Sequence, residues 1–216
     1  MGALPNDGRA PMIPGPPGEA EASRAGWRLL LGLGNPGTDY VGTRHNVGFE
    51  VLDLLAARLG AAWRPEGRAL RAELAEPRVV LVKPTTYMNR SGIALRQAWL
   101  DYSLEEPGQL FVITDDFHLD LGALRLRASG SPGGHNGLAS LEEQLGTDEY
   151  PRMRIGVGDP GRDSVDFVLS RFSAAEQPVV EETLETSSWA AEDWVRGVPF
   201  EQLQARYNRR KPQAGS

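Results

Sequence analysis

The chain has 216 residues, of which 40% are hydrophobic and 24% are charged, values that are typical of a single soluble globular domain with terminal tails. It contains no cysteine, which excludes disulfide bonds, cysteine-ligated zinc, iron–sulfur clusters and thiol nucleophiles. No apolar stretch approaches the roughly 18 residues that a membrane span needs.

The formal net charge is −6, which by itself argues against a nucleic-acid partner. The acidic excess is concentrated in residues 142–201, which carry 14 acidic and 5 basic side chains. A local basic face elsewhere is therefore compatible with the overall charge. The side chains that could supply it are Arg44, Arg127, Arg154, Arg206, Arg209, Arg210 and Lys211.

Residues 1–26 contain five prolines and five glycines without apolar periodicity, which predicts a disordered extension. Beyond it, short apolar runs alternate with segments of helical periodicity. The predicted strands are 28–34, 70–74, 78–82, 110–113, 123–127 and 153–157. The first predicted helix begins at 43 or 46 and ends before Gly60. Further helices are predicted at 91–99, 138–145, 173–195 and 199–207. This alternation predicts an α/β fold, a single globular domain over 27–208 with a mixed central β-sheet flanked by helices, followed by a basic flexible tail, 209–216.

Four of the six asparagines lie at predicted strand ends or in loops flanked by glycine and proline: Asn35, Asn46, Asn89 and Asn136. Each one alone is explained by turn or cap chemistry. Together they follow several predicted strands, so they are expected to meet along one edge of the sheet, where the sites of α/β proteins form.

The segment 32–37, Gly-Leu-Gly-Asn-Pro-Gly, has the glycine spacing of a dinucleotide-binding fingerprint. Its context argues against that function, because Pro36 and residues 38–42 separate it from the next helix. The acidic residue that would bind the ribose is also missing, since the strand 78–82 continues into Lys83 and Pro84.

Three histidines are candidate bases: His45 at a loop-to-helix entry, His118 in an acidic turn and His135 in a glycine-rich loop. Asp115 follows the predicted strand 110–113, where a carboxylate can orient an imidazole and stabilise its protonated form; a cap or turn role is the alternative. Because no activated serine or cysteine accompanies them, the chemistry indicated is histidine-activated water, with asparagine amides donating to a developing oxyanion.

Four loop motifs now occur together in order: Gly34-Asn-Pro-Gly37, Thr43-Arg-His-Asn-Val-Gly48, Lys83-Pro-Thr-Thr-Tyr-Met-Asn89 and Gly133-Gly-His-Asn-Gly-Leu138. They resemble the motifs of bacterial-type peptidyl-tRNA hydrolases, over roughly residues 28–207. The resemblance implies an enzyme that hydrolyses the ester between a peptide's C-terminus and the 3′-terminal ribose of tRNA, without a cofactor, a metal or a covalent intermediate. It also implies a cytoplasmic monomer, with no membrane association, whose partners are the acceptor stem and 3′ end of peptidyl-tRNA and the stalled large ribosomal subunit.

By position in these motifs, His45 would be the general base and Asp115 its stabilising partner. Asn35 would distinguish N-blocked from free aminoacyl-tRNA, while two arginines would clamp the 5′ phosphate. The residues that the resemblance assigns to substrate binding are Asn35, Tyr40, Tyr87, Asn89, Asn136, Arg127 and Arg154.

The sequence departs from the family pattern at Thr114, where a histidine commonly precedes the aspartate, and at 117–120, which is irregular. A second interpretation is an RNA-binding protein on the same scaffold that has lost catalysis. The presence of both His45 and Asp115 favours the enzyme.

Overall fold

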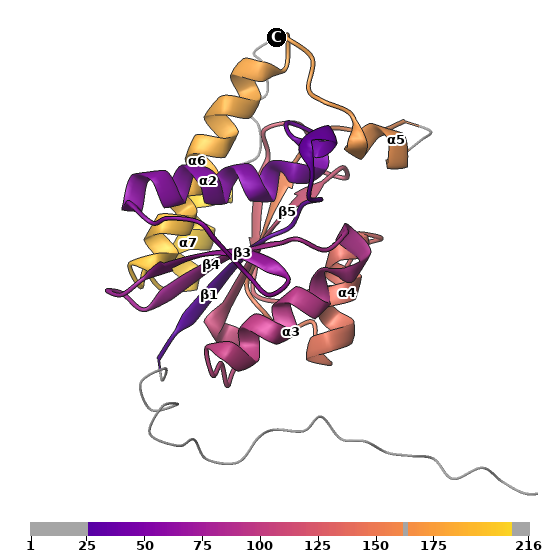
Figure 1. Cartoon of the computed structure of the whole chain (residues 1–216). Coiled ribbons are helices and arrows are strands. Elements are labelled where there is room, and N and C mark those ends of the chain that lie inside the picture. The colour runs from indigo at the N-terminus through magenta and orange to yellow at the C-terminus, as the bar shows by residue number, and fades with distance from the viewer. Residues whose placement is uncertain (1–25, 162–163, 209–216) are drawn as a thin grey trace, which may run out of the picture.

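The computed structural model describes residues 26–161 and 164–208 (Figure 1). The predicted extension, apart from its last residue, and the predicted tail 209–216 lie outside the described residues. No helix in the described ranges is long and apolar enough to cross a membrane.

A seven-stranded mixed sheet forms the centre of the fold, in the order β2-β3-β4-β1-β5-β7-β6. Strands β4, β1, β5 and β7 are mutually parallel, while β2, β3 and β6 pair antiparallel at the two sides. The strand bounds are β1 Arg28–Gly32, β2 Arg64–Glu66, β3 Ala69–Leu74, β4 Val79–Pro84, β5 Leu110–Asp116, β6 Leu124–Arg127 and β7 Arg152–Gly156. The predicted α/β fold with a mixed sheet is thus confirmed, and the carboxyl ends of four parallel strands meet at one edge.

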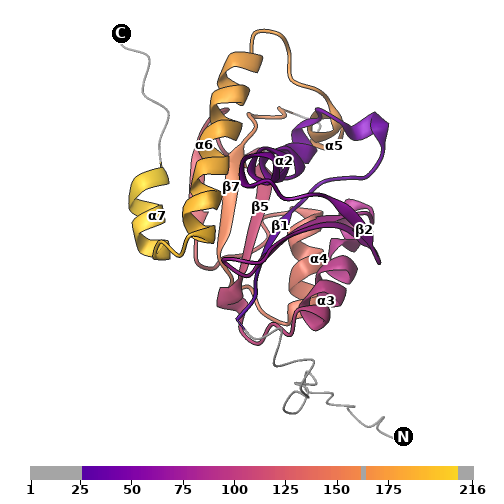
Figure 2. The same ribbon diagram turned by 60° about the vertical axis from the view of Figure 1, so that its left-hand side comes forward.

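Helices cover both faces of the sheet (Figures 1 and 2). Successive residues of β1 alternate between the two resulting cores, with Leu30 in one and Leu29 and Leu31 in the other. Burial on both faces explains why the central strands are continuous apolar runs. On the Leu30 side lie α2 Val47–Leu59, α6 Gln177–Val195 and α7 Phe200–Tyr207; on the opposite side lie α3 Ser91–Asp101 and α4 Asn136–Leu145.

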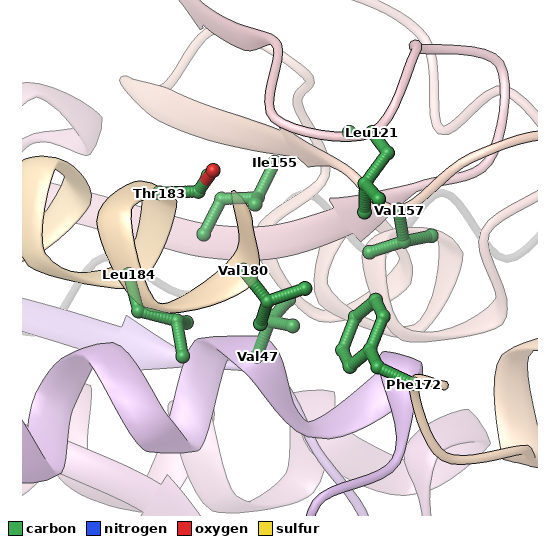
Figure 3. A pocket seen from close by; sticks show the side chains of 9 residues that line it. Val47, Leu121, Ile155, Val157, Phe172, Val180, Thr183 and Leu184 are labelled. Carbon is green, nitrogen blue, oxygen red and sulfur yellow. The ribbon is translucent and has the colours of Figure 1, made fainter. Parts of the chain in front are cut away.

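A small pocket between α2, α6 and the end of β7 is almost entirely apolar (Figure 3). Val47, Val180 and Phe172 point into it, and Thr183 is the one lining residue with a polar side chain. It is a space in the packing of the core and offers no charged group for chemistry.

Two elements were not predicted, β2 and the short helix α5 (Ser164–Leu169). β2 is an exposed Arg-Pro-Glu segment with no apolar alternation, and α5 has only six residues, so neither carries a periodic signal. The predicted helix 173–195 begins four residues late, because Ser173–Glu176 forms a turn in which the Glu176 carboxylate accepts the Ser173 N–H. The strand predicted to end at 113 continues to Asp116, because its polar last residues pair with β7.

Candidate active site

The site lies at the sheet edge where the parallel strands end. His45 comes from a short 3₁₀ turn, Arg44–Asn46, directly before α2. A side chain on Gly48 would place its Cβ 2.5 Å from the Leu33 carbonyl oxygen and 2.6 Å from that of Ile113. The absence of a side chain there lets the start of α2 contact the ends of β1 and β5, which brings His45 to Asp115.

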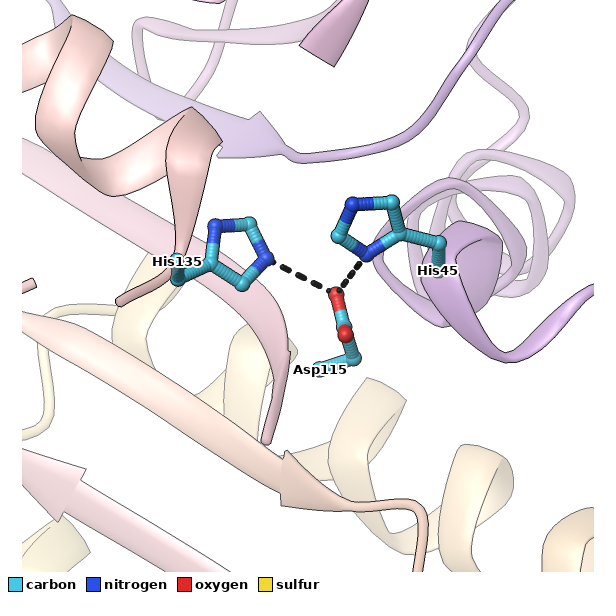
Figure 4. Close-up of side chains that lie close together, drawn as sticks. All are labelled: His45, Asp115 and His135. Carbon is cyan, nitrogen blue, oxygen red and sulfur yellow. Dashed lines mark hydrogen bonds and ion pairs between the residues drawn. The ribbon is translucent and has the colours of Figure 1, made fainter. Parts of the chain in front are cut away.

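Asp115 accepts hydrogen bonds from two imidazoles at a single carboxylate oxygen (Figure 4). Its Oδ1 lies 2.9 Å from His45 Nδ1 and 2.9 Å from His135 Nε2. The carboxylate is 1% exposed, and its second oxygen, Oδ2, is buried without a hydrogen-bond partner in the described part of the chain. His45 uses Nδ1 for this contact, so its Nε2 remains as the nitrogen that can accept a proton.

Burial disfavours the ionised form of Asp115, but its electrostatic attraction to the N–H groups of His135 and His45 and the hydrogen bonds from both rings outweigh it. The pKa of Asp115 therefore lies below its usual range. A permanently ionised carboxylate beside His45 stabilises the imidazolium that forms when His45 takes a proton.

The ligand atoms of His45, Asp115 and His135 lie within 4.8 Å of one another, close enough to suggest a metal site. The hydrogen bonds do not fit one. His135 Nδ1 accepts the backbone N–H groups of Gly137 and Leu138, at 3.1 and 3.2 Å, so a neutral ring carries its proton on Nε2. That nitrogen has no lone pair for a metal.

Asn35 is held by its neighbours in a fixed orientation. Its Oδ1 accepts the Met88 backbone N–H at 2.9 Å, while the Asn46 side chain binds both backbone groups of Asn35, at 2.8 and 3.0 Å. The side-chain NH₂ of Asn35 makes no hydrogen bond within residues 26–161 and 164–208 and stays available to a ligand.

Asn89 and Asn136 are exposed on neighbouring elements. Asn89 lies in the 3₁₀ turn Met88–Arg90, and Asn136 is the first residue of α4. Helix α3, which follows that turn directly, is joined to α4 because Gly92 donates its N–H to Ser140 Oγ at 3.1 Å. The turn also contacts Asn35 through the Met88 N–H, so these asparagines lie on neighbouring elements although they follow separate strands.

The remaining predicted residues lie on or beside this edge, with one exception. Tyr40 is half-buried in the 3₁₀ turn Thr38–Tyr40, and Tyr87 is 61% exposed before the turn that holds Asn89. Arg154 lies beside the glycine-rich loop, with its Nε 3.0 Å from Asp116 Oδ2. Arg127 is opposite Arg152 in the β6–β7 pairing and not opposite Arg154.

The residue opposite Arg154 is Arg125, whose side chain is exposed, as that of Arg127 is. Identifying this pair requires the antiparallel register of β6 and β7, which the sequence alone does not supply. His118, the third candidate base, is exposed next to Phe117, and its side chain does not take part in the Asp115 cluster.

Arg44 is not available as part of a basic surface, contrary to the expectation from its charge. Its guanidinium lies between the rings of Phe167 and Phe172, 4.3 and 4.5 Å from their centroids. It donates to both oxygens of Glu176 at 2.9 Å and to the Val157 carbonyl at 2.8 Å. Arg44 thus fastens the turn that carries His45 to the segment before α6. Its partner Glu176 is 132 positions away, too far for any sequence pattern to indicate.

The Arg44–Glu176 pair leads to a prediction about stability. The hydrogen bonds from Arg44 lower the pKa of Glu176 from 4.5 to about 2, against the opposing effect of burial and with support from Ser173. A lowered pKa in the folded chain contributes stability that is complete above about pH 5 and is lost as the pH falls toward 2. We expect Glu176→Gln to lower Tm near neutral pH, with a difference that shrinks as the pH falls through this range.

Thermal melts of both proteins between about pH 7 and 3 measure this difference. Glu181→Gln, at an exposed position of the helix α6 that follows Glu176, is the matched control and should leave Tm nearly constant. A Tm difference for Glu176→Gln that does not change with pH would contradict the assignment.

Comparison with known proteins gives a consistent result. The family model described as peptidyl-tRNA hydrolase matches residues 29–214. The peptidyl-tRNA hydrolase of Lacticaseibacillus casei (strain BL23) is 41% identical over 185 residues, which cover 84% of this chain and 100% of the relative. That of Prochlorococcus marinus (strain MIT 9313) is 50% identical over 169 residues, 73% of this chain and 82% of the relative. The crystal structure of peptidyl-tRNA hydrolase from Acinetobacter baumannii superposes with a TM-score of 0.78 at 29% identity, covering 85% of this chain and 95% of the other.

Proposed function

This chain belongs to the peptidyl-tRNA hydrolase family, and from that premise we propose that it hydrolyses the ester between a peptide's C-terminus and the 3′-terminal ribose of tRNA with water activated by His45. The observation that carries the proposal is the hydrogen bond between His45 Nδ1 and the buried, ionised Asp115. This hydrogen bond orients the His45 ring and leaves Nε2 as the proton acceptor at the sheet edge that also carries the asparagines.

The reaction then needs one nucleophile and one proton carrier. Water gives a proton to His45 Nε2 while its oxygen bonds to the ester carbonyl carbon, and the carbonyl oxygen takes up the negative charge. When the tetrahedral intermediate collapses, the bond to the ribose oxygen breaks and the His45 imidazolium returns its proton to that oxygen. The products are the peptide acid and tRNA with a free hydroxyl.

The exposed amides of Asn89 and Asn136 are the groups proposed to hold the substrate end and to donate to the oxyanion. The free NH₂ of Asn35 is proposed to bind the carbonyl oxygen of the residue that blocks the amino group. An unblocked aminoacyl-tRNA has no such oxygen and presents an ammonium group to another donor, which explains discrimination between the two.

The tRNA itself is proposed to bind along the same edge. The exposed ring of Tyr87 and the half-buried ring of Tyr40 suit stacking on the unpaired 3′ end. Arg154 and Arg127 are proposed to bind the 5′ phosphate, and the Asp116 contact holds Arg154 in place. Action as a cytoplasmic monomer, on free peptidyl-tRNA and on peptidyl-tRNA held by a stalled large ribosomal subunit, is part of the same proposal.

The phosphate contacts can be measured through salt dependence. We expect Arg154→Gln to weaken tRNA binding and to reduce the slope of log affinity against log salt by about one unit. Arg127→Gln should have a smaller effect, because Arg127 lies two residues, or about 7 Å, farther along the strand pair.

Arg196→Gln is the matched control, since the Arg196 side chain, directly after α6, is 63% exposed and paired with Glu192. Binding titrations at several salt concentrations compare the three variants with the native protein. An Arg154→Gln protein with the native slope would remove Arg154 from the tRNA contact.

The activity is tested by release of the acyl group from an N-acetylaminoacyl-tRNA, compared with the same tRNA carrying a free amino group. The proposal predicts fast release from the blocked substrate only. Binding of tRNA without any release from either substrate would instead favour a non-catalytic RNA-binding protein.

A further inference from the structure

His135 is tied to two different parts of the molecule through its two ring nitrogens. Nδ1 caps α4 by accepting the N–H groups of Gly137 and Leu138. Nε2 lies 2.9 Å from Asp115 Oδ1 (Figure 4). It also lies 2.8 Å from Thr114 Oγ1. The ring is 7% exposed, so these contacts account for both of its polar atoms inside the protein.

The cap fixes the chemistry of the ring. Two backbone N–H groups donate to Nδ1. A proton on Nδ1 would remove the lone pair that accepts them, and the helix cap would be lost. The proton of the neutral ring must therefore be on Nε2, directed at the Asp115 carboxylate. Helix α4 thus acts, through its own N-terminus, to select the tautomer in which His135 donates from Nε2.

We propose that His135 is a positioning residue for the hydrolysis, which acts through Asp115: its Nε2–H shares Oδ1 with His45 and sets how strongly that oxygen holds the His45 ring. The inference rests on the proposed function, in which Asp115 orients His45. Oδ2 has no partner among the described residues, so both imidazoles donate to the same oxygen. The hydrogen bond from His135 therefore directly affects the strength of the hydrogen bond from His45.

Thr114 is a second residue of β5 that contacts His135 Nε2. Its hydroxyl lies within hydrogen-bond distance of His135 Nε2 and of the Asp115 backbone carbonyl, at 3.3 Å. Since Nε2 is a donor with one proton, the Thr114 oxygen shares that proton with Asp115 Oδ1 as a second acceptor, and the Thr114 hydroxyl directs its own proton to the carbonyl. Asp116, the next residue, forms an ion pair with Arg154, whose Nε lies 3.0 Å from Asp116 Oδ2.

Two substitutions separate the cap from the Asp115 contact. The side-chain oxygen of asparagine can replace Nδ1 and is among the best helix caps, but its amide is too short to reach Asp115. The longer amide of glutamine can replace Nε2–H. We expect His135→Asn to keep the native Tm closely and to lower kcat about tenfold to a hundredfold with little change in KM. His135→Gln should recover much of kcat while losing Tm through the weakened cap.

The pH profile distinguishes positioning from a purely structural role. Without the His135 donor, Asp115 binds the protonated His45 ring more tightly, so His135→Asn should move the acid limb of kcat/KM to higher pH. His118→Asn, the same change at the exposed histidine, is the matched control and should leave kcat and the profile unchanged.

A measurement on the native protein needs neither activity nor a variant. Long-range ¹H–¹⁵N correlation spectra should show His135 as the neutral Nε2–H tautomer across the pH range of activity. A proton on Nδ1, or a native kcat and pH profile in a folded His135→Asn protein, would overturn the inference. If the native protein released no peptide at all, the proposed function would fail while the tautomer could still be read.

Discussion

Replacement of His45 by alanine is expected to lower kcat by about 10²- to 10⁴-fold, the usual contribution of a positioned general base. The KM for blocked aminoacyl-tRNA should change little, because the proposed tRNA contacts lie on other side chains along the sheet edge. The fold should persist, since the start of α2 is held by the close approach at Gly48 and by Arg44.

Circular dichroism and tRNA binding, measured on the same sample, separate a loss of chemistry from a loss of structure. His118→Ala removes an exposed imidazole from the turn after β5 and is the matched control, with native turnover expected. Native-like turnover by His45→Ala would exclude His45 as the base.

Asp115→Asn is expected to lower kcat by about 10²- to 10³-fold, the range found when an electrostatic contact to developing charge is lost. Within the described ranges only Oδ1 of Asp115 accepts hydrogen bonds, so an asparagine with its oxygen at that place retains both imidazole contacts. The substitution then removes the negative charge and leaves the orientation and tautomer of His45 in place.

Asp115→Ala provides the comparison, because it removes both the charge and the acceptor. We expect it to be less active than Asp115→Asn and less stable, since two buried imidazole N–H groups lose their partner. Single-turnover rates and Tm values of the two variants check this order. Native kcat in Asp115→Asn would show that the charge on Asp115 has no part in the reaction.

The sequence predicts the central part of the fold well because its signals are local. The apolar runs in β1, β4 and β5 reflect burial on both faces, and Gly60 ends α2 in a left-handed conformation, as a helix-stopping glycine does. β2 is instead an exposed segment that pairs with β3 in a hairpin, and the late start of α6 follows from the turn Ser173–Glu176, so neither carries an apolar periodicity.

The site divides in the same way. His45, Asp115 and the asparagines could be predicted because parallel strands end at one edge and four loop motifs occur in order. The burial of Arg44 between two phenylalanines and the pairing of Arg125 with Arg154 depend on tertiary contacts and strand register. The positioning role proposed for His135 depends on the contacts of both ring nitrogens, which the sequence does not supply.

A single turnover in ¹⁸O-water tests the central claim most directly, with enzyme in excess over N-acetylaminoacyl-tRNA and mass analysis of acid, tRNA and protein. Attack of His45-activated water on the acyl carbon predicts one ¹⁸O in the released acid, none in the terminal ribose, and no acylated protein at any time. Label in the ribose hydroxyl, or an acyl group on the protein before the acid appears, would contradict it.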